Sequence, residues 1–369
     1  MTHHEMHRDT PQATLFADDA VAPARRSLPV IGEQKDIRYY GTPARAILNG
    51  PETTGMGFWS INPYVGCAFG CAYCYARYAH RYRVERSVSS GEAGDAVRED
   101  VGSFPPWLAF ERRVMVKENA PQLLRETLQR GLARHQPLVA GRETVVVGTA
   151  TDPYQPAERR FRLTRGILEV LSEHPRVRIC IITKSPLITR DVDVLGRLAG
   201  RAAAGGGSLT VHVSLITLDR ELARRIEPRA PTPEARLRGV ARLAEAGIDV
   251  GVNVMPVLPG LTDAPEMLDA LVRRIAEAGA THAGACALRL RSDARRRWLP
   301  LVAREFPHLA ARYRIAYARG HEVGDRYREG LAKVFARLCA RHGLRARTYD
   351  EDDDAPGALA ESLQLSFPF

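Results

Sequence analysis

Residues 62–77 read NPYVGCAFGCAYCYAR and place three cysteines within eight positions. These cysteines, Cys67, Cys71 and Cys74, have the spacing CxxxCxxC. Thiolates are soft ligands, and at this spacing three of them can hold one face of an iron–sulfur cubane, each bound to a different iron. Structural clusters and structural zinc sites normally take four protein ligands. The stretch therefore predicts a [4Fe–4S] cluster with one iron left open to a small molecule.

The other three cysteines, Cys180, Cys286 and Cys339, are scattered singly along the chain. This usage indicates metal binding in a reducing compartment rather than a disulfide framework. A zinc knuckle completed by a distant cysteine or histidine is the alternative interpretation, although the sequence has no second CxxC pair. Cys180 and Cys286 fall within apolar strand patterns, which predicts that they pack as small hydrophobic residues.

Outside this stretch, short apolar runs alternate with amphipathic helical patterns. β-branched residues dominate several runs, such as VVVGT and VGVNV, as is typical of buried parallel strands. The alternation predicts an α/β fold, a partial (β/α)6 barrel of the TIM type, with residues 283–290 as an added edge strand. The cysteines follow the first strand, so they should lie at the carboxyl end of the barrel, where barrel enzymes carry their chemistry. The expected strands are 57–62, 113–116, 144–149, 177–182, 209–216 and 248–255, and the expected helices are 121–135, 164–174, 191–201, 233–246 and 264–278.

The sequence predicts four parts along the chain. A run of about 18 apolar residues and an apolar N-terminal segment are both missing, so neither a membrane span nor a secretory signal is expected, and the cytoplasm is the expected location. Polar composition indicates loosely attached ends, and the C-terminal end contains the acidic run DEDDD. The parts are an N-terminal arm (1–37), the barrel (38–290), an Arg-rich helical extension (291–347) with long helices at 298–318 and 325–342, and an acidic tail (348–369).

The chain is basic, with a formal net charge of +10 at pH 7. Residues 289–347 contain 16 Arg or Lys against 5 Asp or Glu, so this segment exceeds the surplus of the whole chain. One interpretation is a surface that binds nucleic acid. The other is compositional, because 49 Arg accompany only 4 Lys, a usage that a GC-rich genome would produce by itself. Both interpretations stay open at this point.

Two further motifs follow expected strands directly. Thr151 and Asp152 come after the strand at 144–149, where they either form a turn or face the site, because the carboxyl ends of barrel strands point to it. Lys184 follows the strand at 177–182 and is one of only four lysines. A lysine ammonium is a compact charge that suits a carboxylate, so Lys184 is a candidate for binding an anionic cofactor group.

The cysteine motif, with the aromatic Tyr73 before its third cysteine, resembles that of the radical S-adenosylmethionine (radical SAM) superfamily. The fuller strings at 62–67 and 74–77 resemble its spore photoproduct lyase-like branch, which is related to DNA repair photolyases, and the resemblance covers roughly residues 38–345. It implies that the open iron binds S-adenosylmethionine. An electron from a flavodoxin- or ferredoxin-like donor then cleaves it to a 5′-deoxyadenosyl radical, which takes hydrogen from the substrate.

By the same resemblance, five residues are expected to contact the cofactor: Tyr73, Thr151, Asp152, Lys184 and Ser214. Glu227 and Arg236 match a family segment of the form EPxxPxxxxR, for which a helix start is an equal alternative.

One departure affects the expected reaction. Thr149 stands about where the lyases carry a hydrogen-donating cysteine, so the carry-over of thymine-dimer repair does not follow from the resemblance. Nucleic acid is the favoured substrate class. A peptide or small metabolite is the alternative within the superfamily, and a non-catalytic iron–sulfur or zinc module that binds nucleic acid is the alternative outside it.

Overall fold

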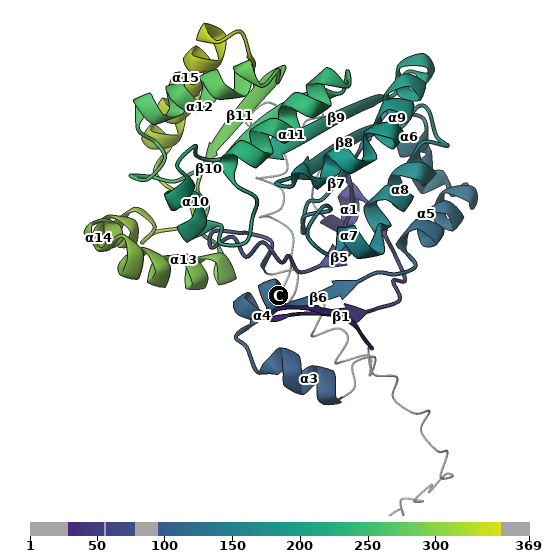
Figure 1. Ribbon diagram of the computed structural model, residues 1–369, viewed down its shortest axis with the longest axis horizontal. Coiled ribbons are helices and arrows are strands. Elements are labelled where there is room, and N and C mark those ends of the chain that lie inside the picture. Colours follow the sequence, from purple (N-terminus) through teal and green to yellow (C-terminus); the bar gives the residue numbers. More distant parts are fainter. Residues whose placement is uncertain (1–28, 55–56, 78–94, 348–369) are drawn as a thin grey trace, which may run out of the picture.

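The computed structural model describes residues 29–54, 57–77 and 95–347 (Figure 1). Neighbouring strands of the central sheet are parallel, except that β3 runs antiparallel to β4. The strand order of this eight-stranded sheet is β12 (Arg345–Arg347), β11 (His282–Ala287), β10 (Asp249–Val257), β9 (Ser208–Ser214), β8 (Arg178–Thr183), β7 (Thr144–Val147), β4 (Trp59–Ile61) and β3 (Leu48–Asn49).

The predicted partial (β/α)6 barrel is confirmed, with β4 and β7 to β11 as its six parallel strands. The sequence forms these strands because β-branched residues fill them, and all four residues of β7 (TVVV) are buried. The helices between the strands cover the outer face of the sheet (Figure 1) with apolar stripes. They are α5 (Ala120–Gln129), α8 (Leu163–Leu171), α9 (Val192–Gly205), α11 (Pro233–Glu245) and α12 (Pro265–Glu277). Shorter elements connect them: α1 (Pro51–Thr54), η1 (Ala133–His135), α6 (Gln136–Val139), α7 (Glu158–Phe161), η2 (Pro186–Asp191) and α10 (Arg220–Ile226).

One expected barrel strand belongs to a second sheet instead. Residues 113–116 form β6, whose residues are all buried, which is why the sequence resembles a barrel strand. The sixth parallel strand of the barrel is β11, which was expected only at the edge. The second sheet has the order β1 (Val30–Gln34), β2 (Ile37–Gly41), β6 (Arg113–Val116) and β5 (Tyr64–Val65), and it lies near α3 (Asp95–Gly102) and α4 (Pro106–Arg112) (Figure 1).

The strand β1 and the first residue of β2 lie inside residues 1–37, the stretch predicted as a loosely attached arm. Lys35 has a φ of 56° and makes the tight turn between the two strands. Tyr39 packs edge-on against Phe161, with ring centroids 5.9 Å apart, and so anchors the hairpin. Residues 1–28 and the predicted tail at 348–369 lie outside the described residues.

The extension contains three helices and a strand rather than two long helices. They are α13 (Ser292–Glu305), α14 (Pro307–Ala316), α15 (Asp325–Arg341) and β12. The predicted helix at 298–318 is interrupted at Phe306 (φ −138°, ψ 58°). Helical geometry is disfavoured for a residue that precedes proline, and Pro307 has no N–H group to donate. β12 pairs with β11 in parallel and so belongs to the barrel sheet. Among the described helices, none is both long and apolar enough to cross a bilayer.

Candidate active site

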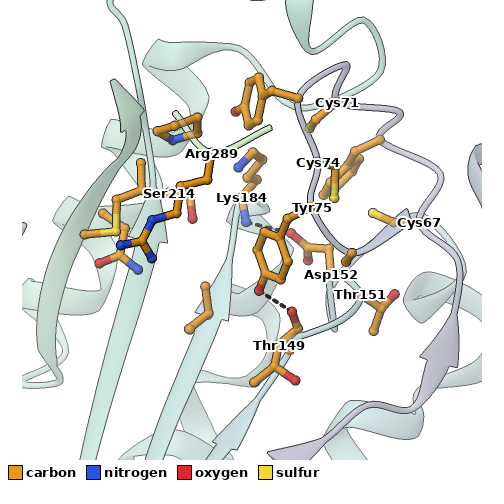
Figure 2. A pocket seen from close by; sticks show the side chains of 18 of the residues that line it. Cys67, Cys71, Cys74, Tyr75, Thr149, Thr151, Asp152, Lys184, Ser214 and Arg289 are labelled. Carbon is orange, nitrogen blue, oxygen red and sulfur yellow. Dashed lines mark hydrogen bonds between the residues drawn. The ribbon is translucent and has the colours of Figure 1, made fainter. Parts of the chain in front are cut away.

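A cavity of about 240 Å³ lies at the carboxyl ends of the parallel strands (Figure 2). One side is the cysteine loop (residues 62–77), and the other sides are the ends of β7 to β11. The position agrees with the rule that parallel α/β barrels carry their sites at this face. The structure brings every predicted site residue to this one cavity: Cys67, Tyr73, Cys71, Cys74, Thr151, Asp152, Lys184 and Ser214.

Backbone hydrogen bonds from distant segments hold the cysteine loop. The Cys67 N–H donates to the Phe110 carbonyl, and the Ala72 N–H donates to the Ile226 carbonyl, each at 2.9 Å. Gly70 has a φ of +66°, and a Cβ there would lie 2.2 Å from a carboxylate oxygen of Glu111. Glycine is therefore required at this position both by the backbone conformation and by the lack of space.

The side chains of Thr151 and Gln155 hold the cysteine loop in place by hydrogen bonds to its backbone. The Thr151 hydroxyl donates to the Gly66 carbonyl at 2.6 Å, and the Gln155 amide donates to the same carbonyl at 3.1 Å. The Gln155 carbonyl oxygen accepts the Ala68 N–H at 2.9 Å. Sequence reasoning missed Gln155, although it belongs to the same strand-end motif as Thr151. Both side chains fix the shape of the backbone that presents the cysteines.

Asp152 ties two strand ends together. Its carboxylate accepts hydrogen bonds from the N–H groups of Tyr154 (2.9 Å) and Lys184 (2.7 Å) and from the Thr183 hydroxyl (2.7 Å). Burial raises its pKa, and these three bonds work against that rise. From the sequence, this motif could be interpreted as a turn or as part of the site. In the structure the motif is both a turn and part of the site, because the turn itself lines the cavity beside the cysteine loop.

Lys184 belongs to a buried network of charges. Its ammonium lies 3.7 Å from a Glu227 carboxylate oxygen and 5.6 Å from the centre of the Tyr73 ring. The same carboxylate accepts hydrogen bonds from the Tyr73 hydroxyl and from Arg236. Burial alone would raise the pKa of Glu227, but Arg236 and Lys184 outweigh it, so its pKa lies below the usual range.

The network settles how the Glu227 segment is built. Glu227 caps the C-terminal end of α10 and does not start a helix, so the alternative interpretation as a helix start is wrong for this residue. Arg236 lies within α11 and donates to the Ser214 carbonyl at 3.1 Å. The segment therefore connects the cysteine loop, through Tyr73, to the end of β9.

The three loop thiols fit a cluster better than a single metal ion. Burial raises the pKa of Cys67 to about 12 and that of Cys71 well above its ordinary value, so they stay protonated unless a positively charged group draws the proton away. Within residues 29–54, 57–77 and 95–347, no three His, Cys, Asp or Glu side chains are placed to ligate one metal ion. In a cubane each thiolate binds its own iron, so three cluster ligands need not converge on one metal ion.

The wall opposite the cysteine loop comes from the end of β11, and we call Cys286, Arg289 and Arg291 the arginine wall. Figure 2 shows Arg289 across the cavity from the three cysteines. Its Nε atom lies 2.8 Å from a Glu322 carboxylate oxygen. Burial and the nearby Arg289 lower the pKa of Arg291. Sequence reasoning missed both arginines, although they directly follow an expected strand, and it treated Cys286 only as a packing residue.

Tyr75 and Thr149 meet along one side of the cavity. The Tyr75 hydroxyl, at the end of the cysteine motif, donates to the Thr149 carbonyl (Figure 2). The Thr149 hydroxyl accepts a hydrogen bond from the Asn62 amide at 2.9 Å. Thr149 thus lines the cavity, and its side chain is hydrogen-bonded to Asn62 at the start of the cysteine loop.

A buried histidine pair forms the floor of the barrel below the cavity. His212 and His282 approach each other at 3.1 Å between their Nε2 atoms, and Arg347 on β12 lies 2.9 Å from His212 Nε2. Arginine can only donate, so His212 Nε2 accepts, and His212 Nδ1–H donates to the side-chain amide oxygen of Asn253 at 3.0 Å. Burial and then Arg347 lower the pKa of His282 to about 4. The pair is therefore neutral at physiological pH.

Known proteins share both the sequence pattern and the fold. The family model of the radical SAM superfamily matches residues 61–272. An uncharacterized protein of Mycobacterium tuberculosis is 37% identical over 295 residues, which cover 80% of this chain and 77% of that protein. An uncharacterized protein of Methanocaldococcus jannaschii is 28% identical over 203 residues, covering 55% of this chain and 61% of that protein.

Two solved structures have a similar fold. A spore photoproduct lyase complexed with dinucleoside spore photoproduct has a TM-score of 0.58 and 15% identity, covering 84% of this chain and 81% of that chain. A mutant of the lyase with bound AdoMet and the same dinucleoside has a TM-score of 0.56 and 14% identity, covering 87% of this chain and 86% of that chain. At these identities the likeness shows the fold alone. The matched residues begin in β4 and include the whole cysteine loop, and with them the chain belongs to the radical SAM superfamily.

Proposed function

We propose that this radical SAM enzyme starts radical chemistry on nucleic acid in a lyase-like reaction, with Cys67, Cys71 and Cys74 as the ligands of its [4Fe–4S] cluster. The observation that carries the proposal is one cavity that joins three free thiols, a partly buried lysine and an arginine wall. The superfamily implies a cluster and S-adenosylmethionine, which require exactly three thiolates and an adjoining space for a small molecule.

When bound, the reduced cluster and S-adenosylmethionine supply a carbon radical that removes a hydrogen atom from the substrate. The chain's own residues bind and orient these groups. The Lys184 ammonium faces the cavity from the end of β8 and suits the carboxylate of the methionine portion. Tyr73 and Ser214 line the same space, whereas Thr151 and Asp152 act by positioning, because their side-chain oxygens are already bonded to the protein.

Nucleic acid as the substrate rests on two supports. The first is the fold shared with a lyase whose structure contains a dinucleoside. The second is charge, since Arg289 and Arg291 line the cavity within a segment that carries a net surplus of positive residues. An electron donor of the flavodoxin or ferredoxin type would complete the system. A reducing protein of this kind binds weakly and transiently.

The experiment uses the full chain, reconstituted anaerobically with iron and sulfide and reduced with dithionite. Uniformly deuterated DNA, RNA and a deuterated protein digest are offered in parallel with S-adenosylmethionine, and the DNA is tested with and without ultraviolet irradiation. Mass spectrometry then measures 5′-deoxyadenosine and its deuterium content. Deuterium from DNA or RNA supports the proposal, because only a substrate hydrogen within the site can enter that product.

Two results contradict it in different ways. Deuterium transfer from the protein digest alone would favour a peptide substrate. Failure of a fully loaded and reduced protein to form any 5′-deoxyadenosine would favour a non-catalytic module. A Lys184→Ala variant serves as the matched control, because it should retain iron and form less product at a limiting concentration of S-adenosylmethionine.

A further inference from the structure

The helix α14 presents an unusual outward face. Leu309 and Tyr313 are buried, and Ile315, which points away from them, is 77% exposed. The other large hydrophobic side chains that stand out on the described surface are 50% exposed or less. Arg312, Arg314 and Arg319 are exposed around this isoleucine. We call Arg312, Arg314, Ile315 and Arg319 the α14 patch.

The arginines of the patch differ from those beside it. Arg304 pairs with Glu305 at 2.8 Å, and Arg341 pairs with Asp269 at 3.0 Å. In the part of the chain that the structure describes, no carboxylate lies within ion-pair distance of the three arginines in the patch. Among the described residues no carboxylate neutralises this charge, so it suits an anionic partner.

The patch is rigidly joined to the cavity. The Tyr317 hydroxyl donates to the carbonyl of Leu288, a cavity residue, at 2.8 Å, and the Tyr313 hydroxyl donates to the Pro259 carbonyl at 2.9 Å. On the other side, Tyr313 contacts Trp298, whose ring meets Tyr73 of the cysteine loop edge-on at 6.2 Å. A partner held by α14 would thus be fixed relative to the cavity.

We propose that the α14 patch docks nucleic acid beside the cavity, with its arginines on backbone phosphates and Ile315 inserted as a wedge against unstacked bases. This inference rests on the proposed function, since it assumes a nucleic-acid substrate. Arginine neutralises phosphates, and proteins that kink nucleic acid use isolated apolar side chains, isoleucine among them, to separate base steps. The patch combines both features.

An acidic protein, such as an electron donor, is the other class of partner that a basic surface fits. The exposed isoleucine favours nucleic acid, because it stands singly among charges rather than within the apolar core that protein interfaces contain. The experiment is designed so that the two partners give opposite results.

The first measurement is the affinity of the full chain for a short fluorescein-labelled duplex DNA, by anisotropy over a range of salt. The double variant Arg312→Glu/Arg314→Glu is compared with Arg130→Glu/Arg238→Glu, which changes the same charge at two exposed arginines, one at the C-terminal cap of α5 and one on α11. Loss of two phosphate contacts should reduce the log–log salt slope by about 1.8 and the affinity about tenfold or more, while the control pair changes little.

The second measurement tests the wedge with 2-aminopurine in the duplex, whose fluorescence rises when its neighbours unstack. Binding of the unaltered chain should raise the signal, Ile315→Ala should suppress the rise with a smaller loss of affinity, and Leu132→Ala should not. The inference is overturned if the two double variants have the same affinity for DNA. It is also overturned if Arg312→Glu/Arg314→Glu leaves the DNA affinity unchanged but slows reduction of the protein by an acidic flavodoxin. Either result leaves the proposed function standing. If the unaltered chain shows no salt-dependent affinity for DNA or RNA, both proposals fail.

Discussion

The cysteine loop and the arginine wall face each other across one cavity but are built in opposite ways. On the loop side the polar groups bond within the protein, as Gln155, Asp152 and Glu227 show. On the arginine side two guanidinium groups approach the same space, with Glu322 as the carboxylate that faces them. The difference separates two tasks. A surface that satisfies itself can hold a cofactor in fixed geometry, while leftover positive charge suits a partner that arrives from outside.

The largest effect is expected on the cysteine loop. Replacement of Cys67, Cys71 or Cys74 by Ala should abolish iron binding, because each thiolate would hold a different iron of the proposed cluster, and iron and sulfide analysis of reconstituted protein measures this. Cys180→Ala and Cys339→Ala are controls that should keep the iron. Cys286→Ala is the sharper control, because this thiol lines the same cavity from the arginine wall. Loss of the cluster in Cys286→Ala would mean that Cys286 is a fourth protein ligand. The arginine wall would then hold the cofactor as well, and the two sides of the cavity would not have separate tasks.

The next effect concerns the buried charges behind the loop. Glu227→Gln should lower the free energy of unfolding by about 3–5 kcal/mol, because it leaves the buried Arg236 without its counter-charge. Urea unfolding of the apo protein measures the change. Glu305→Gln removes a carboxylate from a surface pair and should cost less than about 1 kcal/mol. Equal effects in the two variants would show that the loop side is no more self-contained than the surface.

The buried pair of His212 and His282 makes the free energy of unfolding depend on pH. The folded pKa of His282, about 4, lies below its unfolded value, so the unfolded chain binds more protons and stability rises with pH between about 4 and 6.5. On acidification through this window the chain should lose up to about 3 kcal/mol. His282→Gln should remove part of that loss, and the exposed His308→Gln should not. An identical pH profile in His282→Gln would place the acid sensitivity elsewhere.

Cofactor affinity should respond to Lys184 by a smaller amount. Lys184→Ala should weaken S-adenosylmethionine binding by about 1.5–3 kcal/mol, the range for charge-assisted hydrogen bonds, with normal iron content. Equilibrium dialysis on the reconstituted protein measures this. Lys184→Arg should restore only part of the affinity, since the planar guanidinium differs from a point charge. Unchanged affinity in the alanine variant would leave Lys184 as a member of the Glu227 network only.

The smallest effect is expected at the arginine wall. Arg291→Ala should change the free energy of unfolding by less than about 0.5 kcal/mol, because the described structure gives this side chain no ion pair to lose. A large loss of stability would show that the arginine wall, like the loop, is part of the internal framework.

The sequence predicts the barrel and the residues that meet in the cavity, because both depend on local patterns. β-branched runs identify buried parallel strands, and strand ends carry the residues that meet in the cavity, so Lys184 and Asp152 are found without knowing their partners. Features made by distant pairing escape such reasoning. β6 has the same pattern as a barrel strand but joins another sheet, and Gln155 gains meaning only beside the Gly66 carbonyl. The arginine wall follows an expected strand. Whether its side chains face the cavity depends on how β11 pairs with its neighbours, which the sequence does not show.

The triple arginine at 295–297 illustrates the same limit. A charge count treats the three residues alike, but the structure separates them. Arg296 is exposed, whereas Arg297 is half-buried and lies 3.6 Å from the Glu111 carboxylate. Reversal of Arg297 would set two carboxylates together, so it would report on stability as well as on binding. The exposed arginines of α14 are therefore the better test of a basic surface.

The contacts that shape the cysteine loop also set an order of events during synthesis. The three cysteines leave the ribosome long before the groups that fix them, since Gln155, Ile226 and Trp298 are translated later. Until then the cysteine loop lacks these contacts. Iron delivered at that stage meets reactive thiols instead of a finished pocket, so productive cluster assembly belongs after translation of the barrel. A ribosome-stalled chain ending before α13 should thus fail to retain a cluster that the released protein keeps.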